Sequence, residues 1–388
     1  MTAHRERQRM VYDIVVVGAG PAGSVCATYL AKAGHSVVLV DRATFPRDKP
    51  CGGGFSSAIF QDFPYLSGRR AEIVEGACSV GVLHSPSQRI QLRGRIEMLT
   101  ALRTVFDNVL YEYAVEAGAE SLTGRVVSVR TGSDKVTVRV AGGEELTGRA
   151  VVGADGVTSV VARELGLNRR WPSSKLTACR VVEAPAPETS ILDTYSEDRE
   201  YHFYAKFGGR PGYGWVFPKR TTVNIGVGVT VPHARGLSAV FREFIQTLRR
   251  DGLLPDGVDL SAVRGALVPT GGALRRTFAD RAILVGDSAG MVNPITGGGI
   301  HYAMIAARLA AATLSFCLEE DDLSAEGLEN YQRRWMSAFG KDMNAMVLVQ
   351  RIVVGPFADV LFTIGSRDRV IQEIVSEAMG GHSGGTVD

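Results

Sequence analysis

Unbroken apolar runs recur along this chain and predict the strands of a buried parallel sheet. Residues 14–17 read Ile-Val-Val-Val, which is the pattern of a strand covered on both faces. The runs at 37–40, 150–153 and 282–285 resemble it, and each is followed within two residues by an aspartate. These segments predict a Rossmann-like lobe with acidic residues at the ends of its strands.

Residues 180–231 follow a different pattern, in which short alternating segments such as V-N-I-G-V-G-V are separated by glycine and proline turn signals. This alternation predicts an antiparallel sheet that forms one wall of a substrate lobe. Apolar residues recur on one side of residues 237–251 and predict an amphipathic helix. After Ile300 the chain is expected to be mostly helical.

The first apolar run leads into a glycine motif that predicts dinucleotide binding. Gly18, Gly20 and Gly23 stand as G-x-G-x-x-G, so that the turn can be tight, the backbone can approach a pyrophosphate, and helix and strand can pack closely. The helix that starts at Pro21 would direct its amide groups and its positive dipole end toward the phosphates. Asp41 stands where an acid binds a ribose hydroxyl.

Two later motifs favour FAD over NAD. Asp155-Gly156 and Gly286-Asp287 each follow an apolar run, and a glycine triplet at 297–299 precedes another predicted helix. An acid at the end of a strand can accept a hydrogen bond from a ribityl hydroxyl, and a helix opened by glycines can present amides to the flavin or to phosphate. The alternative is that both aspartates are ordinary turn or N-cap residues. Their occurrence in matching contexts favours the cofactor.

With these motifs, the chain resembles the flavoproteins built like para-hydroxybenzoate hydroxylase, and among them the geranylgeranyl reductases, from about residue 12 to about residue 318. Residues 49–54, K-P-C-G-G-G, match a K-P-C-G-G segment of that family, and residues 213–218 match its Y-x-W-x-F-P signature. Pro211 stands two residues before Tyr213, whereas the family's proline usually stands three before. Related flavin halogenases carry W-x-W-x-I-P, so the segment here disfavours halogenation.

The resemblance implies the residues of the cofactor and substrate sites. In the family the acids of both later motifs contact FAD, and Arg103 matches a helix arginine near the FAD phosphates. The cofactor contacts expected here are Gly18, Gly20, Ala22, Gly23, Asp41, Arg42, Arg103, Val127, Asp155, Gly156, Asp287, Gly297, Gly298, Gly299 and Ile300. Trp215, Phe217 and Pro218 are expected to contact substrate, although alternating aromatic residues on a strand also commonly fill a core.

The reaction that the resemblance implies is reduction of carbon–carbon double bonds in a polyprenyl chain. Reduced FAD would supply hydride, and an acid would protonate the other alkene carbon. Cys51, flanked by Lys49 and three glycines, is the first candidate for this acid, although a lone cysteine is more often a small buried apolar residue. Tyr213 and His301 are the other candidates.

Composition limits the partners and the location. The chain has 388 residues, 45% of them hydrophobic, and a net charge of +2, so nucleic acid is an unexpected partner. Its five cysteines include no C-x-x-C pair, which fits a reducing cytoplasmic setting without a metal site. No apolar stretch is expected to span a bilayer, and residues 346–364 suit a packed or interfacial helix pair. We therefore expect an apolar isoprenoid or lipid substrate and peripheral contact with the inner face of the membrane. The sequence indicates no oligomeric state.

The order of the motifs predicts discontinuous domains. We expect an α/β FAD-binding domain from 10–75, 98–170 and 265–318, a substrate-binding domain with an antiparallel sheet from 76–97 and 171–264, a helical segment at 319–379, and disordered tails at 1–9 and 380–388. No second nucleotide fold is found, so the external electron donor can be NADPH or a ferredoxin-type protein. A flavin-dependent monooxygenase acting on a terpenoid or aromatic substrate, and a flavin-containing prenyl-lipid carrier, are the alternative functions.

Overall fold

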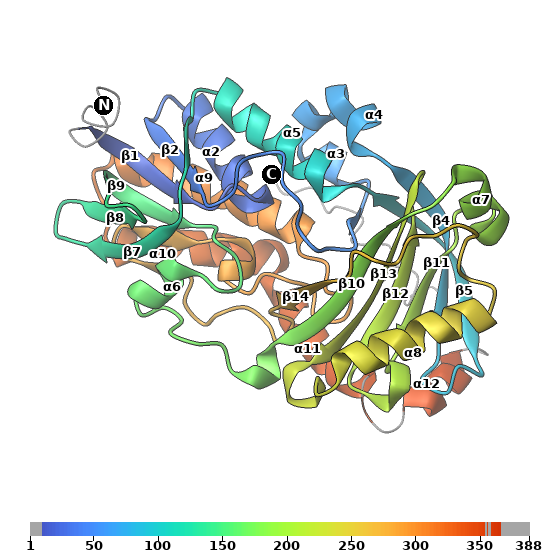
Figure 1. The fold of residues 1–388 in the computed structure, drawn as a ribbon. Coiled ribbons are helices and arrows are strands. Elements are labelled where there is room, and N and C mark those ends of the chain that lie inside the picture. The colour runs from blue at the N-terminus through green and yellow to red at the C-terminus, as the bar shows by residue number, and fades with distance from the viewer. Residues whose placement is uncertain (1–9, 354, 356–357, 366–388) are drawn as a thin grey trace. The chain divides into compact units, whose positions relative to one another are not determined.

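The computed structural model describes residues 10–353, 355 and 358–365, and the chain divides into two compact units. The first unit comprises 1–47, 107–171 and 269–345, and the second comprises 48–106, 172–268 and 346–388. Each unit is described by itself and is built on one sheet (Figure 1). The expected tails at 1–9 and 380–388 lie outside the described residues.

The first unit contains the predicted parallel sheet, in the strand order β15-β16-β9-β1-β2-β6. Four apolar strands, β1, β2, β9 and β16, end where the sequence places the glycine and aspartate motifs, and β1 lies between β2 and β9 in parallel. An antiparallel β7–β8 ribbon continues from the first half of β9. The strands are β1 (Val11–Val17), β2 (Val37–Asp41), β6 (Glu120–Thr123), β7 (Val126–Thr131), β8 (Val136–Val140), β9 (Glu145–Gly153), β15 (Phe278–Ala279) and β16 (Ala282–Leu284).

Several helices of the first unit begin directly after the glycine motifs. They are α2 (Pro21–Lys32), α6 (Val160–Glu164), the 3-10 turn η5 (Gly286–Ser288), α9 (Ile300–Glu319), α10 (Ala325–Trp335) and the π-helical η6 (Met336–Gly340). Among the described residues α9 is the one helix long and apolar enough to cross a membrane, which corrects the expectation that no stretch has this property. Because 56% of its apolar window is buried, α9 also fits a core helix that packs on α2.

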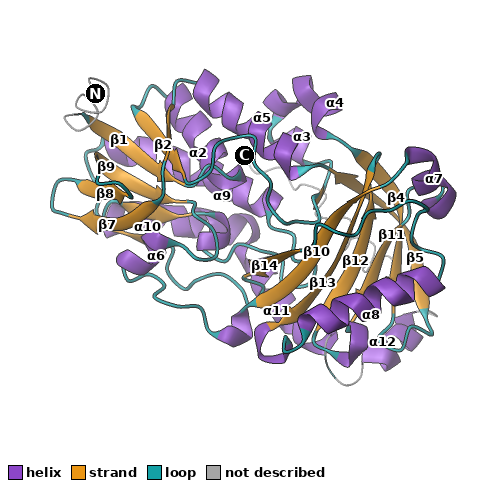
Figure 2. Cartoon of the chain, in the orientation of Figure 1, coloured by secondary structure: helices purple, strands orange, loops and turns teal. Residues whose placement is uncertain are grey.

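The second unit contains a mainly antiparallel sheet in the order β14-β10-β13-β12-β11-β4-β5-β3 (Figure 2). The pairing of β11 with β4 is parallel, and the sequence pattern did not predict it. The strands are β3 (Gly54–Phe55), β4 (Gly76–His84), β5 (Gln91–Thr100), β10 (Thr177–Pro185), β11 (Tyr201–Ala205), β12 (Gly212–Pro218), β13 (Thr222–Thr230) and β14 (Arg264–Val268).

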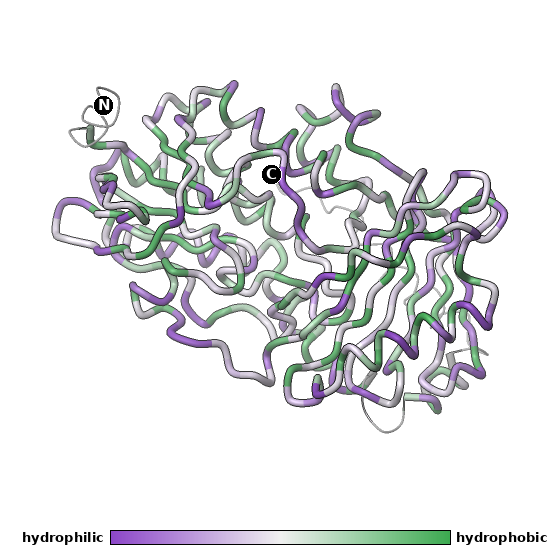
Figure 3. The backbone as a smooth tube through the Cα atoms, viewed as in Figure 1, coloured by the Kyte–Doolittle hydropathy of each residue, from purple (hydrophilic) through white to green (hydrophobic). Residues whose placement is uncertain are grey.

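Helices of the second unit include the predicted amphipathic helix, α8, which begins at Leu237 and ends at Arg250. Its apolar side packs on the sheet together with α7 in one hydrophobic core, and in Figure 3 the strands of this unit alternate between green apolar stretches and white or purple ones. The other helices are α3 (Ile59–Asp62), η1 (Pro64–Arg69), α4 (Arg70–Ile73), η2 (Ser173–Lys175), α7 (Glu188–Tyr195), η3 (Phe207–Gly209), η4 (Val231–His233) and α12 (Ala358–Gly365); α5 (Arg103–Glu116) and α11 (Lys341–Val353) each contribute to both units.

The unit boundaries differ from the domain boundaries expected from the motifs. Residues 48–75 and 98–106 were expected in the FAD-binding domain but belong to the second compact unit. The reason is strand pairing, since β3 joins β5 at the edge of the second sheet. The chain segment that carries Cys51 is therefore packed with the predicted aromatic signature.

Candidate active site

The glycine loop after β1 has the geometry that its sequence predicts. Gly18 has a φ of +100°, which strains any other residue, and its amide donates to the Val40 carbonyl at 2.7 Å. A Cβ at Gly23 would lie 1.7 Å from the Gly18 oxygen, so α2 approaches β1 more closely than a side chain allows. Among the described residues, a Cβ added at Gly20 would meet only Arg47 Nη2, at 3.5 Å, so a phosphate can come close to the backbone at Gly20.

Asp41 shapes this loop as well as ending β2. Its Oδ2 accepts from the Ala19 amide at 2.7 Å, and its Oδ1 accepts from the Ala43 amide at 2.9 Å. Each carboxylate oxygen has a further lone pair, so the residue keeps the capacity to bind a ribose hydroxyl. Arg42, which follows it, is exposed.

Arg47 is a functional candidate that the sequence analysis did not identify. Its guanidinium lies 4.9 Å from the centre of the Phe45 ring, and Nη2 forms a 3.0 Å ion pair with the buried Asp107. Nη1 is buried and has no hydrogen-bond partner in the described part of the chain. Arg47 thus places a positive charge beside Gly20, and its Nη1 can still donate a hydrogen bond. Both properties fit a bound pyrophosphate.

Asp155 has the hydrogen bonds of an ordinary turn or N-cap residue, which was the alternative to an FAD contact. Its carboxylate accepts from Ser159 Oγ at 2.5 Å and from the Val160 and Val161 amides at 2.6 and 3.2 Å. Burial raises the pKa of this carboxyl, and the hydrogen bonds oppose the rise. Asp155 thus fixes the start of α6 beside Gly156, which has a φ of +79°; its contact with FAD stays a prediction.

The third motif forms a turn that leads into α9. Asn293 closes it, since its side-chain oxygen accepts from the Ile295 and Thr296 amides at 2.9 and 3.1 Å. Gly299 is the N-cap of α9, no side chain caps this helix in the described residues, and Asp287 Oδ1 would lie 3.4 Å from a Cβ at Gly299. The Asp287 carboxylate therefore lies beside the start of α9, and its contact with FAD stays a prediction.

The first unit as a whole fits a dinucleotide cofactor. Within the described part of the chain, no side chain caps the start of α2 and Arg47 Nη1 has no partner, and side chains in the glycine loop would collide with backbone. The first unit also holds the other expected contacts except Arg103, with half-buried Val127 on β7 and Ile300 at the first position of α9. Arg103 is buried at the start of α5 and belongs to the second unit, so its contact with FAD stays a prediction. Helix N-termini and a guanidinium are the donors that phosphates prefer.

The aromatic signature lies on one face of the second sheet, opposite the face that α8 covers. Tyr213, Trp215 and Phe217 alternate along β12, and Tyr213 and Phe217 pack with Trp215 outside the α8 core. Phe203 extends this face, since it stacks on Tyr213 at 4.6 Å. We refer to Phe203, Tyr213, Trp215 and Phe217 as the aromatic row.

Glycines on β13 make room for the aromatic row. Gly226 is paired with Trp215, and a Cβ there would lie 2.1 Å from the indole ring. Gly228 is paired with Tyr213, and its added Cβ would lie 3.1 Å from Cys179 Sγ. The V-N-I-G-V-G-V segment thus puts its valines and isoleucine into the α8 core and its glycines under the rings.

The Cys51 loop packs against this same face. A Cβ at Gly52 would lie 2.6 Å from the Phe217 ring, and Gly53, with a φ of +74°, donates from its amide to Cys51 Sγ at 3.4 Å. All five cysteines are free, and Cys51 alone among them is not buried. The structure therefore brings Cys51 together with Tyr213, Trp215, Phe217 and Pro218 in the second unit.

Burial raises the pKa of the Tyr213 phenol well above its usual value, and the nearby thiols of Cys179 and Cys51 would raise it further if they were charged. Tyr213 is therefore a weaker proton donor than an ordinary tyrosine. His301 is half-buried in the first turn of α9, in the first unit, and its role as a proton donor stays a prediction.

A cavity of about 210 Å³ opens within the second unit beside Cys51. Its lining includes Lys49, Cys51, Arg103, Glu183, Asn224 and Arg264. The lining is richer in charge than the apolar substrate cavity that the resemblance implied. Glu183 and Asn224, together with neighbouring Lys219, were not identified from the sequence, although the period of β13 puts Asn224 on the same face as Gly226.

Comparison with known proteins agrees with this arrangement. The profile of a family described as FAD binding domain matches residues 11–341. Digeranylgeranylglycerophospholipid reductase 2 of Methanopyrus kandleri is 32% identical over 370 residues, covering 88% of this chain and 87% of that protein. Menaquinone reductase of Mycobacterium tuberculosis is 33% identical over 325 residues, covering 78% and 76%.

Among solved structures, a geranylgeranyl bacteriochlorophyll reductase-like protein from Thermoplasma acidophilum superposes with a TM-score of 0.81. The match covers 95% of this chain and 92% of that one, at 23% identity. At this identity the likeness shows the fold, which is the α/β fold with a second, mainly antiparallel sheet that the sequence predicted.

Proposed function

This chain belongs to the geranylgeranyl reductase family of FAD-dependent oxidoreductases, and from this premise we propose that it saturates carbon–carbon double bonds in a polyprenyl chain. The observation that carries the proposal is a half-exposed thiol beside a row of aromatic rings: Cys51 lies on the face formed by Tyr213, Trp215 and Phe217. Aromatic rings hold an aliphatic chain without giving it polar partners, and the thiol supplies a proton donor.

FAD, when bound and reduced, supplies the hydride that forms one of the two new C–H bonds. The residues of the first unit that would hold it are the 18–23 loop, Arg47, Asp41 and the start of α9. The chain's own task is to supply the second hydrogen as a proton. In our proposal the Cys51 S–H bond breaks as the other alkene carbon is protonated, and the thiolate regains its proton from water.

Cys51 is preferred to Tyr213 as the proton donor. An isolated alkene has no carbonyl to polarise it, so the reaction depends on an acid that can release its proton. Since burial raises the pKa of Tyr213 well above its usual value, its phenol releases a proton less readily. Tyr213, with the rest of the aromatic row, is proposed to orient the substrate and exclude water.

The names of the relatives support an isoprenoid lipid as the substrate class. One relative is named for a digeranylgeranyl phospholipid and another for menaquinone, and a prenyl chain is common to both molecules. A geranylgeranyl or phytyl diphosphate belongs to the same class. The electron donor, NADPH or a ferredoxin-type protein, is a separate question that an anaerobic reduction assay with each donor answers.

Peripheral contact with the inner face of the cytoplasmic membrane fits such a substrate. Leu348 and Ile352 on α11 are 60% and 58% exposed, and Val360 and Ile364 on α12 are 55% and 50% exposed. Exposed Arg351 lies among them and suits an anionic lipid surface. The double variant Leu348→Glu, Ile352→Glu should co-sediment less with anionic vesicles than the wild type. Unchanged co-sedimentation would contradict the proposed membrane contact.

An anaerobic turnover assay tests the function. The yellow protein is reduced with dithionite and mixed with geranylgeranyl diphosphate or a prenylquinone, and products are read by mass. The proposal expects a gain of two hydrogens per event, together with flavin reoxidation in the absence of oxygen. Flavin that stays reduced until air is admitted, followed by an oxygenated product, would instead place the chain among the monooxygenases.

A further inference from the structure

The Cys51 loop is tied to the aromatic row by one buried side chain, that of Asn224 on β13. Asn224 is 1% exposed, and its Nδ2 donates to the Cys51 carbonyl at 2.8 Å and to Glu183 Oε2 at 2.8 Å. Its Oδ1 accepts from Trp215 Nε1 at 2.7 Å. The indole can only donate and the carbonyl can only accept, so the orientation of the amide is fixed by chemistry.

Lys219 closes the same network from the other side. Its Nζ, in a side chain that is 1% exposed, donates to Glu183 Oε2 at 2.6 Å and to the Ala101 carbonyl at 3.0 Å. Ala101 in turn donates from its amide to the Gly53 carbonyl at 2.9 Å. Glu183 therefore has a buried cation and an amide on one oxygen, and Thr222 Oγ1 on the other at 2.5 Å.

We infer that Asn224 is a positioning residue, which sets the Cys51 thiol relative to Trp215 and so aims the proton at a substrate lying along the aromatic row. The inference rests on the proposed function, in which Cys51 delivers that proton. Three elements distant in sequence meet at this amide: the Cys51 loop, Glu183 on β10 and Trp215 on β12. A side chain that only stabilised the sheet would have no need to hold the carbonyl of the thiol residue.

The test compares Asn224→Asp with Thr222→Val in the FAD-containing protein. Asn224→Asp keeps an acceptor for Trp215 but loses both N–H donors and places a second carboxyl beside Glu183. Thr222→Val removes a hydrogen bond to Glu183 from the same network without touching Cys51. Should Asn224→Asp fail to fold, Asn224→Ser is used, because its shorter side chain no longer reaches the Cys51 carbonyl.

The first readout is the rate of alkylation by iodoacetamide as a function of pH, with Cys51→Ser as the blank, since the other four cysteines are buried. Asn224→Asp should change this rate by about fivefold or more, as expected for a lost buried hydrogen bond, whereas Thr222→Val should leave its pH profile unchanged. The second readout is the solvent deuterium isotope effect on turnover, which should rise in Asn224→Asp because proton delivery becomes slower than hydride transfer.

An alkylation profile of Asn224→Asp that superposes on the wild type, with an unchanged isotope effect, would overturn the inference. Alkylation needs no substrate, so this arm gives its answer even if the wild type reduces no polyprenyl compound. In that case the proposed function fails on the turnover assay, and the placement of Cys51 by Asn224 is still judged by the alkylation profile.

Discussion

Gly226 faces Trp215 across the β12–β13 pairing, and the indole occupies the space that a side chain at position 226 would fill. A Cβ would lie 2.1 Å from the ring, and the ring is also held by the 2.7 Å hydrogen bond that its Nε1 donates to Asn224. Two features of β13 therefore place Trp215 in the aromatic row: Gly226 has no side chain, and the side-chain amide of Asn224 accepts the indole hydrogen bond.

Gly226→Ala should displace Trp215 and disturb both the row and its link to Asn224. Overpacking of this kind costs about 1–3 kcal/mol, and we expect a loss of that size in the free energy of unfolding in urea, together with reduced turnover. Gly228→Ala is the matched control, because its Cβ meets Thr177 and Cys179 side chains at 3.0 and 3.1 Å and the Trp215 ring only at 3.8 Å. Equal losses in both variants would contradict the special role of the space under Trp215.

Arg47→Ala should weaken FAD binding, because it removes the cation and the unpaired donor beside Gly20. A hydrogen bond to a charged group contributes about 1.5–3 kcal/mol, so the dissociation constant of FAD should rise about tenfold to a hundredfold, measured by flavin fluorescence on titrating the FAD-free protein. Arg42→Ala, on the exposed side of the same loop, should have a smaller effect. Arg47→Lys keeps a cation beside the buried Asp107 but removes the guanidinium. Weaker FAD binding in this variant therefore reports lost phosphate binding and not a loss of folding stability.

Most of the fold could be predicted because its signals are local. The apolar run, the glycines and Asp41 fall within one short segment, and β1, α2 and β2 form there as expected. The alternation of V-N-I-G-V-G-V likewise predicts β13 and its two faces. The parallel pairing of β11 with β4 could not be predicted, because it joins strands far apart in the chain and neither sequence encodes the choice of neighbour.

The candidate site was predicted less completely than the fold, because its contacts also join residues far apart in the chain. Asn224 and Cys51 are separated by 173 positions, and a polar residue in an alternating strand looks like any other until its partner is known. The sequence analysis named Arg42 and missed Arg47, because only the folded chain shows that Arg47 is the less exposed of the two and lies beside Gly20. Cys51 could be proposed from the sequence because the glycines around it form a recognisable motif, and its catalytic role stays a prediction.

Cys51→Ser should slow alkene reduction while leaving FAD bound. General acids contribute about a hundredfold to ten-thousandfold to rate, and serine is too weak an acid to replace the thiol, so the measurement is single-turnover reoxidation of the reduced flavin by substrate. Cys179→Ser is the matched control, since Cys179 is a buried thiol near the same row, 5% exposed. Unchanged turnover in Cys51→Ser would remove the thiol from the mechanism.

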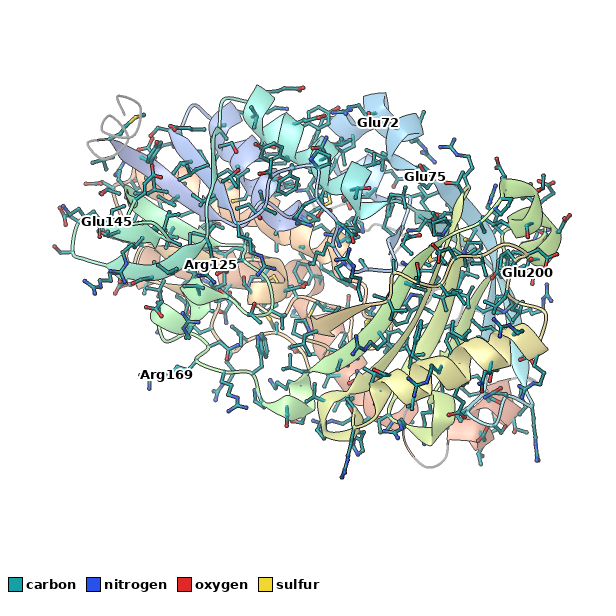
Figure 4. The ribbon with its side chains drawn as sticks, viewed as in Figure 1. Glu72, Glu75, Arg125, Glu145, Arg169 and Glu200 are labelled. Atoms are coloured by element: carbon teal, nitrogen blue, oxygen red, sulfur yellow. The ribbon has the colours of Figure 1, made fainter. Side chains whose placement is uncertain are left out.

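A buried pair of imidazoles should make the fold sensitive to acid. His84 Nε2 and His202 Nδ1 are 3.0 Å apart, and His84 stacks on Tyr204 at 3.8 Å. Burial lowers the pKa of His84 to about 4, although Asp251 opposes this. Burial, His84 and then Arg93 lower the pKa of His202 to about 3. Arg93 is ion-paired with Glu200, which is labelled in Figure 4.

Both imidazoles are thus neutral in the folded protein at pH values where the unfolded chain already binds protons. Because the folded pKa values lie below the ordinary value of 6.5, stability is complete above about pH 6.5 and falls as the pH drops toward 4 for His84 and toward 3 for His202. The loss should be about 2 kcal/mol for each imidazole by pH 5, measured as the free energy of unfolding in urea at pH 7.5 and pH 5. The double variant His84→Phe, His202→Leu should lose most of this dependence, whereas exposed His233→Gln should keep it; an undiminished dependence in the double variant would show that other groups cause it.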